Sequence, residues 1–184
     1  LSLGTSAPPF ALRDVVSGEA SQLDSFAGKS ALLVMFLCRH CPYVLHVQDE
    51  IAKLGRDYEQ SGLGIIGISS NDPGHYPDDA PERLKEMAQR LGFRFPFCFD
   101  ETQDVAKAYK AACTPDFYLF DKERRLVYRG QLDDSRPGTS KPVTGRDLRA
   151  AIDALLGGTP IESHQKASIG CSIKWKPGNA PAYA

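Results

Sequence analysis

The sequence lacks any long hydrophobic run. Its longest apolar stretch is about seven residues, whereas a transmembrane helix needs about 20. We therefore expect no segment that crosses a membrane. The sequence also lacks an excess of either charge, because the formal net charge is -1 and no block of basic residues occurs. This removes most of the electrostatic case for binding nucleic acid or an anionic membrane surface.

The N-terminal residues contain neither basic side chains nor an apolar segment, so the sequence predicts no signal peptide, although a leader already removed would leave the same start. The number of cysteines is five, which is odd for a disulfide framework. A chain of 184 residues is also long enough to form a substantial core without disulfides. Reduced thiols in a reducing compartment are the simpler expectation, and we expect a cytoplasmic protein.

Internal repeats and low-complexity linkers are absent too, and the length predicts a single domain over residues 1–184. Apolar runs with strand character alternate with stretches of helical periodicity. The expected elements are a hairpin of 10–14 with 19–23, strands at 32–37, 63–69, 95–99, 117–120 and 125–129, and helices at 42–60, 81–91, 100–111 and 144–156. The segment 159–184 has no clear period and is predicted to be an irregular tail that packs on the domain.

The most informative motif is Cys38-Arg39-His40-Cys41, which lies between an apolar strand-like run and a helical stretch. At a helix N-terminus, free N–H groups and the positive end of the dipole stabilise a thiolate. The placement therefore indicates thiol–disulfide exchange. The alternatives are half of a zinc site and two inert core cysteines. Because zinc needs about four ligands and no second Cys-x-x-Cys or His-x-His pair is present, we expect neither a metal nor a cofactor.

The order of strands and helices around this motif resembles that of thioredoxin-fold proteins of the AhpC/TSA-related, peroxiredoxin-like group, which includes thiol–disulfide isomerases and thioredoxins. The resemblance covers nearly the whole chain, and its matching stretches are 36–44, 70–72, 113–117, 133–138 and 168–179. It implies an α/β, thioredoxin-like fold with a central mixed sheet flanked by helices, an N-terminal hairpin and an extended C-terminal tail. Members of the group usually read Cys-Asn-His-Cys-Pro, so Arg39 is a departure.

In this arrangement Cys38 is expected to be the partly exposed, attacking thiol, and Cys41, one turn later, is expected to resolve the mixed disulfide. His40 and Arg39 are expected to stabilise the Cys38 thiolate further. A stabilised thiolate makes the disulfide more oxidising, so we predict a higher reduction potential than a Gly-Pro spacer would give.

The resemblance also implies a cis-proline loop at Thr114-Pro115 that faces the cysteine pair. The exposed backbone of Thr114 would then pair with an extended substrate segment. Local sequence alone favours a trans proline at the start of a strand. Gly130, at the end of the strand 125–129, is expected in a third loop at the site, with a simple turn as the alternative.

Two further cysteines are candidates for extra redox thiols. Cys113 lies two residues before Pro115, and Cys171 lies in the tail, which could fold back over the same face. The alternative for both is a small buried hydrophobe, the commonest fate of a free cysteine. Cys98 is expected in the core. The loop 133–138 is expected to satisfy itself, with Arg136 paired to an aspartate.

Two accessories of thioredoxins are missing. Leu37 stands where a tryptophan usually precedes the first cysteine, and Met35 stands approximately where a buried acid takes the proton of the second. Asp116, beside the proline loop, is a guess for that acid. Peroxiredoxins place a proline seven and a threonine three residues before the reactive cysteine. Ala31 and Met35 hold those positions before Cys38.

These observations predict a thiol–disulfide oxidoreductase that exchanges disulfides with protein or small-molecule thiols and depends on an unidentified electron donor. The main alternative is a peroxiredoxin-like peroxidase that reduces hydroperoxides, although its peroxide-binding residues are missing. An alternative of another class is a non-catalytic protein that binds a metal or cofactor through the same thiols.

Overall fold

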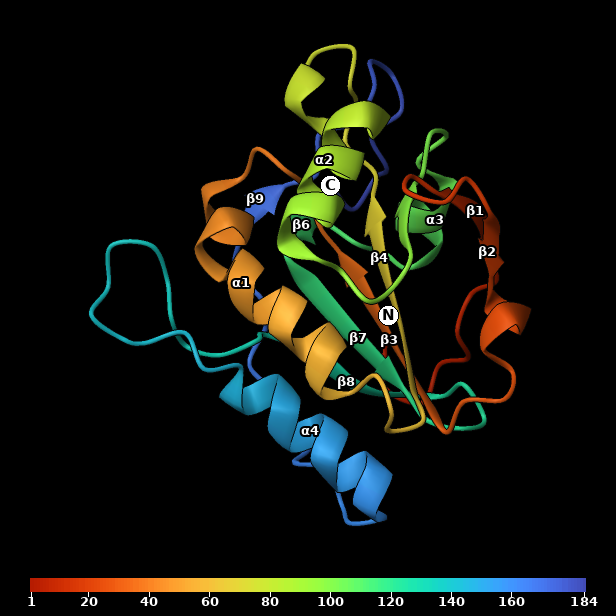
Figure 1. Ribbon diagram of the computed structural model, residues 1–184, viewed down its shortest axis with the longest axis vertical. Coiled ribbons are helices and arrows are strands. Elements are labelled where there is room, and N and C mark those ends of the chain that lie inside the picture. Colours follow the sequence, from red (N-terminus) through yellow and green to blue (C-terminus); the bar gives the residue numbers. More distant parts are fainter.

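Seven strands form the central sheet of the computed structural model, which describes residues 1–184 (Figure 1). The elements are β1 (Ala11–Asp14), β2 (Ala20–Gln22), η1 (Leu23–Phe26), β3 (Ala31–Phe36), α1 (Pro42–Asp57), β4 (Leu63–Ser69), η2 (Pro77–Asp79), α2 (Pro81–Leu91), β5 (Phe97–Phe99), α3 (Asp104–Ala108), β6 (Cys113–Thr114), β7 (Asp116–Phe120), β8 (Leu126–Gly130), α4 (Arg146–Gly157) and β9 (Cys171–Ser172). The sheet order is β2-β1-β5-β4-β3-β7-β8. The strands β3, β4 and β5 are parallel, and the other pairings are antiparallel. This is the predicted thioredoxin-like mixed sheet.

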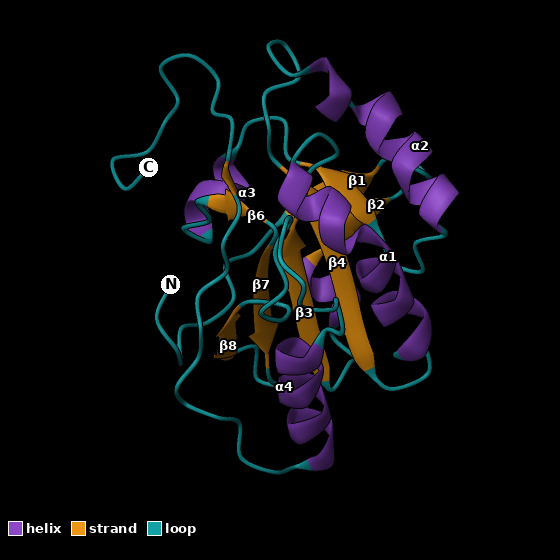
Figure 2. Cartoon of the chain, turned by 90° about the vertical axis from the view of Figure 1, so that its left-hand side faces the viewer, coloured by secondary structure: helices purple, strands orange, loops and turns teal.

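The central strands β3 and β4 are buried along their whole length, as their continuous apolar sequences predict. Side chains of α1, α2 and α4 pack into one hydrophobic cluster, and side chains of α3 pack into a second. Figure 2 shows α1 and α2 on one side of the strands and α3 on the other. The helices therefore cover both faces of the sheet.

Most predicted boundaries are close to the observed ones, but the expected helix over 100–111 is wrong. Only Asp104–Ala108 is helical. The buried carboxylate of Asp100 accepts the N–H groups of Val105 and Ala106, at 3.3 and 3.0 Å, and so caps the helix from outside it. Gln103 has a left-handed backbone with φ 67°, which interrupts any helix that would begin earlier.

The C-terminal tail contains one short strand that the sequence did not predict. In β9, Cys171 pairs with Thr114 and Ser172 with Cys113 of β6, in a separate two-stranded sheet. Figure 1 shows β9 beside β6, close to the first turn of α1. A strand of two residues is too short to show a period of alternation, so only its hydrogen-bonding partner defines it.

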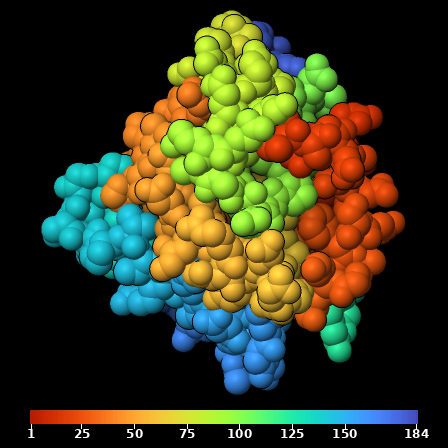
Figure 3. Space-filling view, in the orientation of Figure 1, coloured from red at the N-terminus to blue at the C-terminus, as the bar shows by residue number.

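Neither length nor apolar character allows any helix of this structure to span a bilayer. The face seen in Figure 3 is formed largely by α1 and α2, and the loop between β8 and α4 projects beside α1.

Candidate active site

The two cysteines of the motif lie where the central strand β3 passes into α1. Cys41 is the N-cap residue of α1, and Pro42 is its first residue, a position at which the missing N–H of proline costs nothing. Both cysteines are completely buried, each with 0% of its surface exposed. The prediction of a partly exposed Cys38 is therefore wrong for this structure.

The two thiols share one proton. A hydrogen bond with Cys38 lowers the pKa of Cys41 to about 4, with smaller contributions from Cys171 and the backbone N–H of Val44. The same hydrogen bond raises the pKa of Cys38, and burial and the charge of Asp79 raise it further. One negative charge is shared by the two sulfur atoms, so the stabilised Cys38 thiolate stays a prediction.

Thr114 contacts both cysteines from the opposite side. Its hydroxyl Oγ1 lies 3.3 Å from Cys38 Sγ, and its carbonyl oxygen lies 3.6 Å from Cys41 Sγ, close enough to accept a hydrogen bond when that thiol is protonated. The peptide bond between Thr114 and Pro115 is cis, the conformation that the family resemblance implied. Thr114 is thus brought to the cysteine pair as expected.

The backbone edge of Thr114 is not free, however. It is paired with Cys171 in the β6–β9 sheet, and Gly170 packs directly on its carbonyl group. The edge at which an extended substrate was expected to pair is therefore occupied by the tail of the same chain.

Gly130 also lies under the tail. It pairs with Phe117 at the end of β8, and its carbonyl accepts a hydrogen bond of 2.6 Å from Ser168 Oγ. A Cβ atom at this position would lie 2.5 Å from the carbonyl oxygen of Lys166. The structure surrounds Gly130 with these groups instead of leaving it open to a substrate, and its absent side chain allows the tail to approach.

His40 is held by a buried acid that the sequence did not reveal. Its ring Nδ1 hydrogen-bonds to the carboxylate of Asp79, which is fully buried and also accepts the backbone N–H of Arg39 at 2.7 Å. The guanidinium of Arg39 lies 3.5 Å from the exposed carboxylate of Asp78. Arg39 and His40 therefore each face an acid, and the charge of Asp79 opposes the expected stabilisation of a Cys38 thiolate.

A chain of hydrogen bonds connects Asp79 to the tail. The side-chain amide of Asn71 donates to Asp79 at 3.0 Å, and its carbonyl oxygen accepts the backbone N–H of Lys174 at 2.8 Å. Asn71 is buried. Its position after β4 could have indicated a site, because ligands gather at the carboxyl ends of parallel strands. No sequence signal connects it to Asp79 or to the tail.

The three remaining cysteines have different surroundings. Cys171 contacts Cys41, whereas the thiol of Cys113 points toward the carbonyl of Pro115, at 3.9 Å. Burial raises the pKa of Cys113 to about 12. Cys98 is completely buried in the core, as predicted. Asp116 is hydrogen-bonded to Tyr118 and paired with Arg129 at 3.3 Å. It is thus engaged by other partners.

One group of donor atoms could hold a cation. Cys38, His40 and Asp79 each offer one ligand atom, and these atoms lie within 4.8 Å of one another. In the structure His40 and Asp79 are hydrogen-bonded to each other, whereas the Cys38 sulfur contacts the hydroxyl of Thr114.

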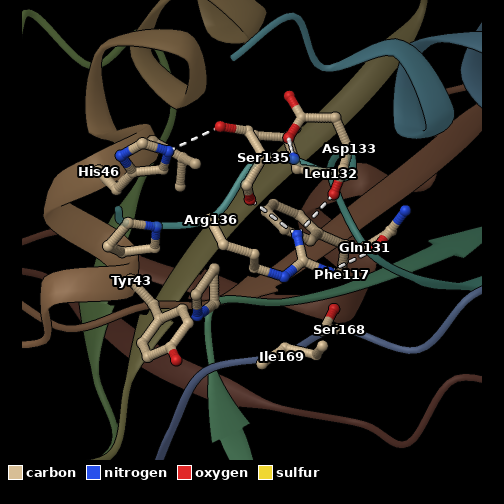
Figure 4. Close-up of a pocket in the computed structure, with 13 residues that line it drawn as sticks. Tyr43, His46, Phe117, Gln131, Leu132, Asp133, Ser135, Arg136, Ser168 and Ile169 are labelled. Atoms are coloured by element: carbon tan, nitrogen blue, oxygen red, sulfur yellow. Dashed lines mark hydrogen bonds between the residues drawn. The ribbon is translucent and has the colours of Figure 1, made fainter. Parts of the chain in front are cut away.

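A small pocket adjoins the cis-proline, between α1, the tail and the loop after β8 (Figure 4). Tyr43, Pro115 and Ile169 line one part of it, and Arg136 extends into another. The predicted ion pair of Arg136 with an aspartate is wrong, because its guanidinium donates to the carbonyl oxygens of residues 133 and 135, both at 2.8 Å. The loop nevertheless satisfies its own polar groups, as expected.

A sequence profile described as Redoxin matches residues 2–148. Among characterised relatives, the thiol-disulfide oxidoreductase ResA of Geobacillus kaustophilus is 25% identical over 157 residues, which are 84% of this chain and 79% of that protein.

Two solved structures are also similar. An uncharacterized conserved protein from Geobacillus kaustophilus is 55% identical, with a TM-score of 0.94 over 96% of this chain and 94% of that one. A putative thioredoxin from Neisseria meningitidis, 22% identical, has a TM-score of 0.63 over 86% of this chain and 94% of its own, which supports the fold alone.

Proposed function

The chain belongs to the Redoxin family, and from this premise we propose that it is a thiol–disulfide oxidoreductase that works through Cys38 and Cys41. One observation carries the proposal. The two cysteines lie together at the start of α1, and the threonine of the cis-proline loop contacts both sulfur atoms. The name of the ResA relative supports the same chemistry.

The reduced pair contains one proton and one negative charge, and this distribution suggests the first step. With the shared proton on Cys41, the Cys38 thiolate attacks one sulfur of a substrate disulfide. A mixed disulfide with Cys38 forms, and the other half of the substrate leaves as a thiolate. Cys41 holds the proton of the pair during this step and has to lose it before the second step.

The second step reverses the roles. The departing substrate thiolate takes the proton from Cys41, and Cys41 attacks Cys38 Sγ. The Cys38–Cys41 disulfide forms, the remaining half of the substrate leaves as a thiolate, and two electrons have passed from the pair to the substrate. Run in the opposite direction, the same steps oxidise a dithiol.

Substrates are proposed to be protein thiols and disulfides. The groups that would receive them are Thr114 and the pocket beside Pro115, which offers apolar surface from Tyr43 and Ile169. A substrate that pairs with the backbone of Thr114 has to displace β9, because that edge is occupied in the structure.

The test compares the wild-type protein with Cys38→Ser and Cys41→Ser. We expect the wild type to reduce insulin with dithiothreitol as electron donor and to show a reversible two-electron disulfide in a glutathione titration. Both variants should lose turnover. The proposal fails if the wild type neither reduces insulin nor forms a Cys38–Cys41 disulfide. Consumption of hydrogen peroxide at enzymatic rates would instead favour the peroxidase.

A further inference from the structure

We infer that Cys171 is a third redox thiol, which exchanges disulfides with Cys41 and connects the buried pair to thiols in solution. This inference rests on the proposed function of Cys38 and Cys41, and it adds to that function a resolving residue supplied by the C-terminal tail.

Cys171 lies next to the active-site cysteines. Cys171 lies directly opposite Thr114 in the β6–β9 pairing, and Thr114 is the residue that contacts both active-site sulfurs. The side chain and the backbone N–H of Cys171 both favour the Cys41 thiolate and lower the pKa of Cys41, so Cys171 lies beside Cys41. Three thiols thus form a continuous series, with Cys41 in the middle.

Solvent reaches Cys171 but not the two cysteines of the motif. Cys38 and Cys41 expose no surface, whereas Cys171 is partly exposed. Thiol–disulfide exchange requires the attacking sulfur to reach a disulfide sulfur in line. With β9 in place, a thiol from solution can approach Cys171 but cannot approach the pair. Electrons that enter or leave the closed protein therefore pass through Cys171.

The C-terminal tail holds Cys171 firmly against the protein core. Backbone groups of Ile173 and Lys174 bond to Ala112 and Asn71, at 2.9 and 2.8 Å. The buried side chain of Gln103 donates to the carbonyl of Lys174 at 3.0 Å and accepts from Lys176 at 3.0 Å. These bonds attach the residues directly after Cys171 to the protein core, so the thiol is presented in one place, as an exchange partner must be presented.

The exchange consists of three thiol–disulfide steps, and each step conserves atoms and electrons. Starting from the Cys38–Cys41 disulfide, the Cys171 thiolate attacks Cys41 Sγ, the Cys41–Cys171 bond forms, and Cys38 leaves as a thiolate that takes a proton. An external thiolate then attacks Cys171 Sγ, and Cys41 leaves as a thiolate. A second external thiolate releases Cys171 and carries away the external disulfide. The protein gains the two electrons that the two external thiols lose.

The electrostatics of Cys171 change in the direction that this exchange needs. Burial raises its pKa to about 11, and the next causes are the hydrogen bond to Cys41 and the charge on Cys41. Both of these depend on a Cys41 thiolate and disappear when Cys41 enters a disulfide. The ammonium of Lys174, which lowers the pKa of Cys171, remains. Cys171 is therefore a better nucleophile when the pair is oxidised than when it is reduced.

Cys113 offers the matched comparison. It lies on β6 next to Thr114 and is partly exposed like Cys171, but its thiol points toward the carbonyl of Pro115. The charge of Cys41 raises the pKa of Cys113, but the Cys113 thiol is hydrogen-bonded to the Pro115 carbonyl and not to Cys41. If any cysteine near the site could exchange disulfides with Cys41, Cys113 would do so too. If the exchange requires a thiol directly beside Cys41, Cys171 is the one that takes part.

Peptide mapping tests the inference directly, because trypsin cleaves after Arg39 and separates the two cysteines of the motif. Cys38, Cys41, Cys113 and Cys171 fall in four tryptic peptides, 30–39, 40–53, 111–122 and 167–174. The protein is oxidised with diamide, blocked with iodoacetamide and digested without reductant. We expect the wild type to link 30–39 to 40–53, and Cys38→Ser to link 40–53 to 167–174. Peptide 111–122 should stay unlinked in both.

Kinetics give the second readout. The oxidised wild type, Cys171→Ser, Cys171→Ala and Cys113→Ser are reduced with glutathione, and the appearance of free thiols is followed. Both Cys171 variants should still form the Cys38–Cys41 disulfide, but glutathione should reduce it at least about tenfold more slowly, because the partly exposed thiol is gone. Cys113→Ser should match the wild type. Two Cys171 variants of different polarity separate this effect from a folding defect.

The inference is overturned if Cys38→Ser forms no link between 40–53 and 167–174, or if both folded Cys171 variants are reduced as fast as the wild type. Failure of the proposed function looks different. In that case the wild type itself forms no link between 30–39 and 40–53 and does not reduce insulin.

Discussion

Gly170 packs against the carbonyl group of Thr114 so closely that a Cβ atom on Gly170 would lie 1.9 Å from the carbonyl oxygen. No side chain fits there, and the obstacle is backbone that cannot rotate away. Gly170→Ala should therefore dislodge β9 from β6 without removing any of the five cysteines from the sequence. We expect iodoacetamide to label Cys38 and Cys41 at least about tenfold faster in the reduced variant, because local opening governs access to buried groups.

Gly157→Ala is the matched control. Gly157 lies at the end of α4 with no atom within 4 Å of its would-be Cβ, so alanine should leave labelling unchanged and raise helix stability slightly. If Gly170→Ala is labelled no faster than this control, β9 does not close the site.

The hydroxyl of Thr114 should control the reactivity of Cys38. It lies 3.3 Å from Cys38 Sγ and lowers the pKa of that thiol, against the larger opposing effects of Cys41 and burial. Thr114→Val keeps the shape of the side chain but removes the hydroxyl. We expect insulin reduction to slow by about threefold to tenfold, the value of one hydrogen bond of about 1 kcal/mol. Thr114→Ser restores the hydroxyl and should recover most of the rate. Equal loss in both variants would point to packing instead.

Asp79 should be essential for the shape of the motif and should also restrain Cys38. Its buried carboxylate accepts hydrogen bonds from the backbone of Arg39 and from Asn71, and its charge raises the pKa of Cys38. An amide in its place offers only one acceptor oxygen to several donors. Asp79→Asn should cost about 1–3 kcal/mol of unfolding free energy, measured by urea denaturation.

The same variant should shift the ultraviolet thiolate titration of Cys38 to lower pH, because the negative charge beside it is gone. Asp78→Asn is the control, since its side chain is 67% exposed and its ion pair with Arg39 is at the surface. A thiolate titration identical in Asp79→Asn and the wild type would contradict the electrostatic role of Asp79.

Sequence alone could locate the cysteine pair because every signal for it is local. A continuous apolar strand, two cysteines three residues apart and a proline at the start of a helix occupy the single stretch from Ala31 to Pro42. Thr114 and Pro115 lie far away in sequence, and the resemblance to the thioredoxin fold supplied their position.

The chemistry of the pair could not be predicted in the same way, because it depends on contacts between distant segments. Asp79 reaches His40 across 39 residues, and no pattern marks one aspartate among many in a loop as the buried one. Arg39 and His40 look like a cationic motif in the sequence, and only the fold places an acid opposite each. Burial of Cys38 likewise depends on the fold. The strand that closes the site, β9, contains two residues, and so short a strand leaves no recognisable pattern in the sequence.

The pH dependence of stability should reveal the shared proton of the pair. In the folded protein the pKa of Cys41 is lowered to about 4 and that of Cys38 is raised, whereas both thiols in the unfolded chain should titrate near the ordinary value of about 8.5. Between these values the unfolded chain binds two protons at the pair and the folded protein binds one. Stability contributed by the pair therefore rises with pH from about 4 to about 8.5.

Above that range the sign reverses, because the unfolded chain loses both protons while the folded protein keeps the one on Cys38. Urea denaturation of the reduced wild type and of Cys41→Ser, at intervals from pH 5 to pH 10, measures this contribution as a difference. The difference cancels the titrating groups that do not interact with Cys41, because the two proteins share them. It should be largest near about pH 8.5 and smaller on either side. A difference that stays constant with pH would mean that Cys41 is an ordinary protonated thiol.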